Sequence, residues 1–317
     1  MCPPRSRPAM PSPRPPALRR TPLPIVVAGL ALASLPASLA AQQAPLRLFI
    51  SVDMEGIGGV GTPAMTSSSG KDYATGRRLA TDEVNTVVEA IFAHTPDAEI
   101  LVNDSHGDHQ NLLHTELDPR VVYIQGSIKP LGMVQGLDDS FDGALFIGYH
   151  AMAGDPDGFL AHTGSGSVKG LWLNDVEVGE GGMNAAFAGS QGVPVILVSG
   201  DAAAARELEA LLGTETVTTK TPETPSSARL VHPDEVHRRL RAGVAAALDR
   251  LAAGGYEAWD PGAPVRIRMR FESTTHVEVL QSIPGMSKVD GFTVAYTARD
   301  ADEAYRLIRL MYRFVGV

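Results

Sequence analysis

The sequence predicts an α/β fold in which a mostly parallel sheet is flanked by helices, joined to a second, smaller α+β lobe. The first observation is a series of short runs that are apolar throughout, beginning at residues 46–53. The second is that apolar residues at helical spacing separate these runs, as over residues 71–94. Strands that are apolar throughout and alternate with helices are typical of a parallel sheet covered on both faces. Further strands are expected over residues 99–103, 121–125, 143–149 and 193–199.

The second part of the chain has a different pattern. An Ala-rich helix is expected over residues 201–212, and residues 213–230, rich in Thr, Pro and Ser, are expected to form a surface connection. Apolar residues at helical spacing then predict a helix over residues 232–251. We therefore expect a main α/β domain over residues 41–212 and a C-terminal α+β lobe over residues 213–317. The lobe's other expected elements are strands over 265–271 and 292–296, a short helix near His276 and a helix over 301–315.

The first forty residues have the composition of a secretory signal peptide. Residues 1–40 contain five arginines and no acidic residue, followed by a short apolar run over residues 25–33. They end in Ser38-Leu39-Ala40, with small residues where a signal peptidase requires them. The apolar run is too short to span a bilayer comfortably. We therefore expect an exported, periplasmic protein; whether the route is Sec or twin-arginine stays open.

Charge excludes several classes of partner for the mature chain. Five of the 27 Lys and Arg residues lie in the leader, which leaves 22 against 36 acidic residues and a formal net charge of −14. A chain this acidic is a poor candidate for binding nucleic acid or anionic lipid. The only cysteine, Cys2, also lies in the leader, so the mature chain has neither a disulfide nor a thiol nucleophile.

Candidate functional residues lie where the predicted strands end. Asp53 closes the first strand, and Glu55 lies on the same side because strand side chains alternate with period two. Two carboxylates held this close repel each other unless a cation lies between them. Taken alone, the pair is equally compatible with two solvated acids at the mouth of a loop.

Two histidines follow other apolar strands. His106 ends the segment Asn103-Asp-Ser-His106, and His150 directly follows the run over residues 143–149. Histidine beside acids suits a zinc ligand whose second ring nitrogen is oriented by a carboxylate, and Asp104 is the candidate for that carboxylate. Each histidine taken singly is as compatible with an ordinary hydrogen-bonded residue.

A further acid, Glu180, projects from a glycine-flanked turn that leads into a helix near Met183. Glu177 is interpreted as a surface acid of a hairpin. His109 and His114 fall in a segment that we expect to be exposed, and they are left out of the candidate site.

Five residues together supply oxygen and nitrogen donors without a thiolate: Asp53, Glu55, His106, His150 and Glu180. This set suits a pair of Zn²⁺ ions, with Mn²⁺ or Co²⁺ as alternatives, that share a bridging carboxylate. A two-metal site polarises a carbonyl and lowers the pKa of a bound water, which predicts a metal-dependent hydrolase. The same donors could hold a single metal.

The segment Ser51-Val-Asp-Met-Glu-Gly56 resembles the S-x-D-x-E-G signature of the D-aminopeptidase family of metallopeptidases, the type associated with dipeptide transport. The resemblance covers the mature chain nearly end to end. It continues through Asn103-Asp-Ser-His106, Gly136-Leu-Asp-Asp139, Gly148-Tyr-His150, His162 and Asn174-Asp-x-x-Val-Gly-Glu180.

The resemblance implies a role for each candidate. Asp53 would bridge two zinc ions, with Glu55 and His106 completing one site and His150 and Glu180 the other. His162 would be a catalytic group, either a general base or an oxyanion stabiliser. The family fold consists of two α/β lobes in a self-compartmentalising, ring-like homo-oligomer such as a decamer. The leader is a departure, because the best-known members are cytoplasmic, and it leaves the physiological substrate open.

Three hypotheses for the function remain at this point. The chain is a two-zinc aminopeptidase acting on short peptides such as D-Ala-D-Ala, a metal-dependent amidohydrolase acting on non-peptide amides, or a non-catalytic exported peptide-binding protein. The presence of all five candidate ligands together with His162 favours catalysis. The preference for D over L residues cannot be derived from composition or spacing.

Overall fold

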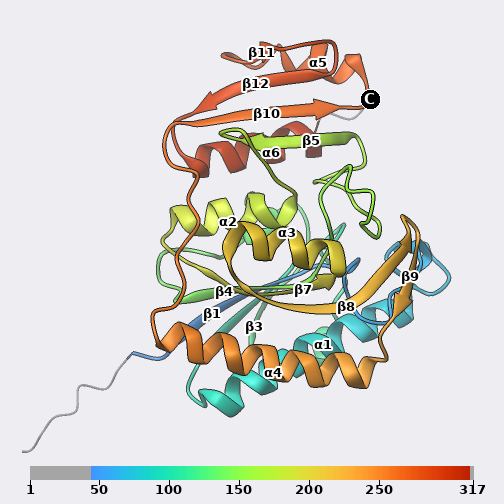
Figure 1. Cartoon of the computed structure of the whole chain (residues 1–317), viewed down its shortest axis with the longest axis vertical. Coiled ribbons are helices and arrows are strands. Elements are labelled where there is room, and N and C mark those ends of the chain that lie inside the picture. Colours follow the sequence, from blue (N-terminus) through green and yellow to red (C-terminus); the bar gives the residue numbers. More distant parts are fainter. Residues whose placement is uncertain (1–43, 315–317) are drawn as a thin grey trace, which may run out of the picture. The chain divides into compact units, whose positions relative to one another are not determined.

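The computed structural model describes residues 44–314 (Figure 1). The predicted signal peptide, residues 1–40, lies outside the described residues. Within them, no helix is both long enough and apolar enough to span a bilayer.

The main sheet has seven strands in the order β3-β2-β1-β4-β7-β8-β9, and every neighbouring pair is parallel except the hairpin of β8 and β9. The central strands are buried and apolar on both faces, which confirms the predicted parallel sheet. The strand bounds are β1 Arg47–Val52, β2 Glu99–Asp104, β3 Val122–Ile124, β4 Gly143–Tyr149, β7 Val195–Asp201, β8 Glu215–Thr224 and β9 Ser227–Leu230.

Helices cover both faces of this sheet (Figure 1). On one face, α1 (Tyr73–His94) and α4 (Pro233–Ala252) pack against each other and share a core with alternate residues of the central strands. On the other face lie α2 (Glu180–Ser190) and α3 (Ala202–Leu212). Short 3₁₀ turns lie at Pro63–Met65, His114–Glu116 and Gly132–Val134.

A second, antiparallel sheet has the strand order β11-β12-β10-β5-β6. Helix α6 (Ala301–Phe314) lies between this sheet and α2, so its apolar residues join the core that α2 shares with the main sheet (Figure 1). The remaining bounds are β5 Val168–Leu173, β6 Val176–Glu177, β10 Val265–Phe271, α5 Thr274–Leu280, β11 Ser287–Lys288 and β12 Thr293–Ala298.

The predicted surface connection over residues 213–230 is wrong, because these residues form the β8–β9 hairpin. With α4, this hairpin belongs to the main sheet and its helical layer, whereas β5 and β6, which precede residue 212, pair into the second sheet. The chain therefore passes between the sheets more than once. How these elements group into independently folding domains stays a prediction.

Candidate metal centre

The candidate residues meet at the carboxyl edge of the main sheet. Asp53 follows β1, His106 lies two residues after β2, and His150 directly follows β4. The fourth position is the first turn of α2, which begins at Glu180. Because β1 lies between β2 and β4 in the sheet, all of these strand ends are adjacent, as expected for a site in a parallel α/β sheet.

The first cluster consists of Asp53, Glu55 and His106. Nδ1 of His106 lies 3.1 Å from Oδ1 of Asp53 and 2.9 Å from Oε2 of Glu55. The other ring nitrogen, Nε2, lies 2.9 Å from the carbonyl oxygen of Thr66. Since a carbonyl can only accept, Nε2 is the donor in this bond, which leaves Nδ1 as the ring nitrogen that faces the two carboxylates.

The second cluster consists of His150, His162 and Glu180. Nε2 of His150 lies 3.7 Å from Oε1 of Glu180 and 3.4 Å from Oδ2 of Asp53. Nε2 of His162 lies 3.3 Å from the same Glu180 oxygen, and the rings of His150 and His162 stack with centroids 4.1 Å apart. Asp53 therefore directs one carboxylate oxygen toward each cluster.

Backbone carbonyls also set the tautomers of the histidines in the second cluster. Nδ1 of His150 donates to the carbonyl of Ala151, and Nδ1 of His162 donates to the carbonyl of Leu160, both at 2.9 Å. Each ring thereby presents its Nε2 to the cluster. A ring whose second nitrogen is held in this way is typical of a metal-binding histidine.

The buried polar atoms of the site fit a divalent cation. Among the described residues, Oδ2 of Asp53, Oε2 of Glu55 and Nε2 of His150 are buried and make no hydrogen bond. Leaving three such atoms unpaired costs free energy unless another group binds them. An oxygen- and nitrogen-rich set without thiolate suits zinc or a similar borderline ion.

The pKa values reflect the same concentration of negative charge. Burial and the neighbouring carboxylate of Glu55 raise the pKa of Asp53 to about 6. Burial opposes protonation of His106, but the charges of Glu55 and Asp53 outweigh it and hold the pKa of His106 well above its ordinary value. A site that attracts a proton this strongly attracts a divalent cation for the same electrostatic reason.

Two glycines allow the ends of β1 and β4 to approach closely. The backbone N–H of Gly56 donates to the carbonyl of Gly148 at 2.7 Å. A Cβ at Gly56 would lie 2.0 Å from the carbonyl oxygen of Tyr149, and a Cβ at Gly148, where φ is +74°, would lie 2.3 Å from the carbonyl oxygen of Asp53. Larger residues here would therefore separate Asp53 and Glu55 from His150.

Two polar side chains behind the clusters hold the backbone that carries the donor residues. Lys220 of β8 has no solvent exposure, and its Nζ donates to the carbonyls of Glu55 and Val60. On α3, the carboxylate of Glu207 accepts from the backbone N–H of Met152 at 2.8 Å and of Gly179 at 3.3 Å. These two N–H groups lie close in sequence to His150 and Glu180, so Glu207 supports the second cluster.

Two expectations about this region are wrong. Asp104 does not orient His106, because its carboxylate accepts from the backbone N–H groups of Asn111 and Leu112 and from the hydroxyl of Tyr123. His109 is buried instead of exposed, and its Nδ1 donates to the carbonyl of Asp104 at 2.9 Å. Glu177 is exposed, as predicted.

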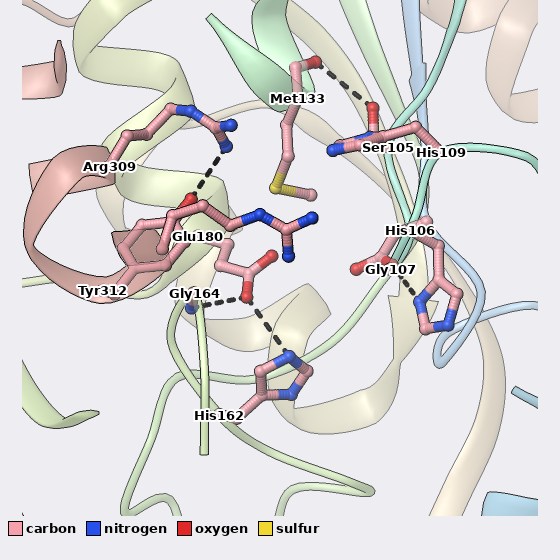
Figure 2. A pocket seen from close by; sticks show the side chains of 12 residues that line it. Ser105, His106, Gly107, His109, Met133, His162, Gly164, Glu180, Arg309 and Tyr312 are labelled. Carbon is pink, nitrogen blue, oxygen red and sulfur yellow. Dashed lines mark hydrogen bonds and ion pairs between the residues drawn. The ribbon is translucent and has the colours of Figure 1, made fainter. Parts of the chain in front are cut away.

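A cavity of about 140 Å³ opens onto both clusters. Figure 2 shows Glu180 and His162 on one side of it, His106 on another, and Arg309 and Tyr312 of α6 opposite His106. The residues of α6 were not among the candidates predicted from the sequence, because they lie about 130 residues beyond the last predicted ligand. Their helical spacing is the only sequence signal for them, and it does not indicate which elements the helix faces.

The chain is similar to known proteins over nearly all of the residues that the structure describes. The sequence profile of the peptidase M55 family, described as D-aminopeptidase, matches residues 46–310. A D-aminopeptidase of Bacillus subtilis (strain 168) is 36% identical over 271 residues, which is 84% of this chain and 96% of the relative.

Among solved structures, the fold is similar to the Zn-dependent D-aminopeptidase DppA from Bacillus subtilis, described as a self-compartmentalizing protease. The TM-score is 0.81 at 36% identity, over 84% of this chain and 96% of that one. The family resemblance carried by the S-x-D-x-E-G segment is thereby confirmed. The chain belongs to the M55 family of D-aminopeptidases.

Proposed function

We propose that this protein is an exported, zinc-dependent aminopeptidase that removes an N-terminal D-residue from short peptides. The observation that carries the proposal is Asp53, whose two carboxylate oxygens face two separate clusters of histidine and carboxylate donors. The family membership and the names of the two relatives support the D-peptide substrate. Export rests on the composition of residues 1–40 alone.

In the proposed site, Asp53 would be shared by two zinc ions, Glu55 and His106 would hold one of them, and His150 and Glu180 would hold the other. Bound zinc would polarise the peptide carbonyl and lower the pKa of a water molecule. The protein holds these donor atoms in position through the backbone carbonyls behind the histidine rings and through the glycines between the strand ends.

His162 is proposed as the group that moves the proton. Its side chain is 30% exposed, against 1% for His150, so it lies at the cavity surface. Its Nδ1 is occupied by the Leu160 carbonyl, which leaves Nε2 to accept a proton from the attacking water and return it to the leaving amine. The carboxylate of Glu180 lies 3.3 Å from Nε2 and stabilises the ring while it carries the proton.

An assembly of several copies is also proposed, because the solved relative is described as self-compartmentalizing. A ring would restrict access to the cavity and exclude folded proteins as substrates. Size-exclusion chromatography with light scattering tests this proposal, and a monomer at micromolar concentration would contradict it.

The activity is tested by measuring amino-acid release from D-Ala-D-Ala and L-Ala-L-Ala, with and without a strong chelator. We expect cleavage of the D-dipeptide that the chelator abolishes and that added zinc restores. Cleavage of the L-dipeptide alone would support the hydrolytic site but contradict the proposed preference for D-residues. If the zinc-replete protein cleaves neither, the proposed function fails in favour of an amidohydrolase on other amides or a binding protein.

A further inference from the structure

The cavity has a cationic wall opposite its metal-binding residues. Arg309 and Arg313 lie one helical turn apart on α6, and both line the cavity. Arg309 is 6% exposed, and its guanidinium donates to the hydroxyl of Tyr312 at 3.0 Å and to the carbonyl of Lys129 at 3.1 Å. The more exposed Arg313 donates to the hydroxyl of Ser127 at 3.3 Å.

Neither guanidinium forms an ion pair with a carboxylate among residues 44–313, at a limit of 4.0 Å between nitrogen and oxygen. Arg306 of the same helix behaves differently, because its Nε lies 2.8 Å from the carboxylate of Asp302. A buried arginine that is bonded only to neutral acceptors retains an uncompensated positive charge. Such a charge favours an anionic partner.

One further basic side chain, Lys129, lies next to Arg309, whose guanidinium donates to its backbone carbonyl. Nζ of Lys129 donates to the side-chain oxygen of Asn103 at 2.7 Å, again a neutral partner. The carboxylates across the cavity are assigned to the metal ions, and they are not available to neutralise the arginines.

Helix α6 is fixed close to the second cluster. The hydroxyl of Tyr305 donates to the side-chain oxygen of Asn184 on α2 at 3.0 Å, four residues along that helix from Glu180. The ring of Tyr312 packs on Gly164, where a Cβ would lie 2.6 Å from ring carbons, and the N–H of Gly164 donates to Glu180 at 2.6 Å. The arginine wall and the metal-binding wall thus belong to one small cavity.

We propose that Arg309 and Arg313 bind the C-terminal carboxylate of the substrate while its N-terminal residue lies at the metal-binding clusters. This inference rests on the proposed function and narrows it to free peptides short enough to reach both walls. Guanidinium and carboxylate groups match in charge and in hydrogen-bond geometry, and bonds between them are among the stronger hydrogen bonds in proteins. The two arginines are assigned to substrate binding and not to the proton transfer.

The test compares D-alanyl-D-alanine with its C-terminal amide, which lacks only the carboxylate charge. For the zinc-replete protein, we expect kcat/KM to be about 10- to 100-fold higher for the acid, mainly through a lower KM, as for other charged hydrogen bonds. Arg313→Gln should reduce kcat/KM for the acid about tenfold and leave the amide unchanged. Arg309→Gln should act in the same direction, with its fold checked by thermal unfolding.

Arg306→Gln is the matched control, because it removes a guanidinium from the same helix that is already paired with Asp302, and neither substrate should respond. Equal cleavage of acid and amide by the wild type would overturn the proposal. So would an equal fall for both substrates in Arg313→Gln, which would indicate a role in the transition state.

If neither compound is cleaved, the proposed aminopeptidase activity is wrong, and this result does not decide whether the arginines bind a carboxylate. Calorimetric binding of the same acid and amide then decides the carboxylate site, with tighter binding of the acid expected and equal binding contradicting it.

Discussion

Replacing Glu83 by glutamine tests how charge is arranged behind the metal centre. Glu83 lies in the middle of α1, is 1% exposed, and accepts a hydrogen bond from the backbone N–H of Gly58 at 2.5 Å. Its other carboxylate oxygen has no partner among the described residues. Burial raises the pKa of Glu83 to about 8 and lowers the pKa of nearby Lys220 to about 7, so both side chains are expected to be neutral between these values.

The sign of the effect on stability follows from the raised pKa of Glu83. A carboxyl whose pKa is about 8 in the folded state and 4.5 unfolded stabilises the fold by holding a proton. This stabilisation is fully present below pH 4.5 and is lost as the pH rises toward 8. At about 1.4 kcal/mol per pH unit, the full loss is on the order of 5 kcal/mol. Glutamine keeps the acceptor for Gly58 and does not titrate.

The assay is urea unfolding of wild type and Glu83→Gln at pH 5, 6.5 and 8, at one fixed concentration of free zinc. At pH 5 the variant should be within about 1 kcal/mol of wild type, the expected cost of one unpaired amide donor. At pH 8 it should be more stable than wild type by about 2–4 kcal/mol. Glu89→Gln, an exposed change on the same helix, should differ by less than about 0.5 kcal/mol at every pH.

A difference between Glu83→Gln and wild type that does not change with pH would refute the reasoning. Destabilisation of the variant by several kcal/mol at pH 8 would also refute the reasoning. It would mean that Glu83 is ionised and compensates the charge of Lys220.

Three further substitutions test the site. His162→Ala should retain both zinc ions and the fold yet lower kcat by two or more orders of magnitude, and loss of a zinc ion would instead make His162 a ligand. Glu207→Ala should lower the free energy of unfolding by about 2–4 kcal/mol and weaken zinc binding, because it leaves two backbone N–H groups unpaired. Unchanged zinc affinity would contradict the role of Glu207 in supporting the second cluster. Gly56→Ala should impair zinc binding, since its Cβ would overlap the carbonyl of Tyr149, and a fully active variant would contradict this.

The sequence was sufficient to predict the elements whose signals are local. The apolar runs that became β1, β2 and β4 each end in a donor residue, so the positions of Asp53, His106 and His150 followed from the strand pattern. Adjacent parallel strands then place those ends together for a general geometric reason. The structure brings Asp53, Glu55, His106, His150 and Glu180 together in the two clusters, and their binding of metal stays a prediction.

Features that depend on tertiary contacts could not be predicted. The polar stretch of β8 resembles a surface segment, yet Lys220 is buried in it, where its Nζ donates to the carbonyls of Glu55 and Val60. The group that orients His106 is the backbone carbonyl of Thr66, which has no signature in the sequence. Arg309 reaches the cavity only because α6 packs between the second sheet and α2.

The most direct test of the two-metal centre is the zinc content per chain, measured by elemental analysis after dialysis against metal-free buffer. We expect two zinc ions in the wild type and one in either His106→Ala or Glu180→Ala, with turnover abolished in both variants. Asp53→Ala should lose both ions, because each of its carboxylate oxygens faces a different cluster. A single zinc ion in the wild type, or Glu180→Ala with full activity and unchanged zinc, would contradict the assignment.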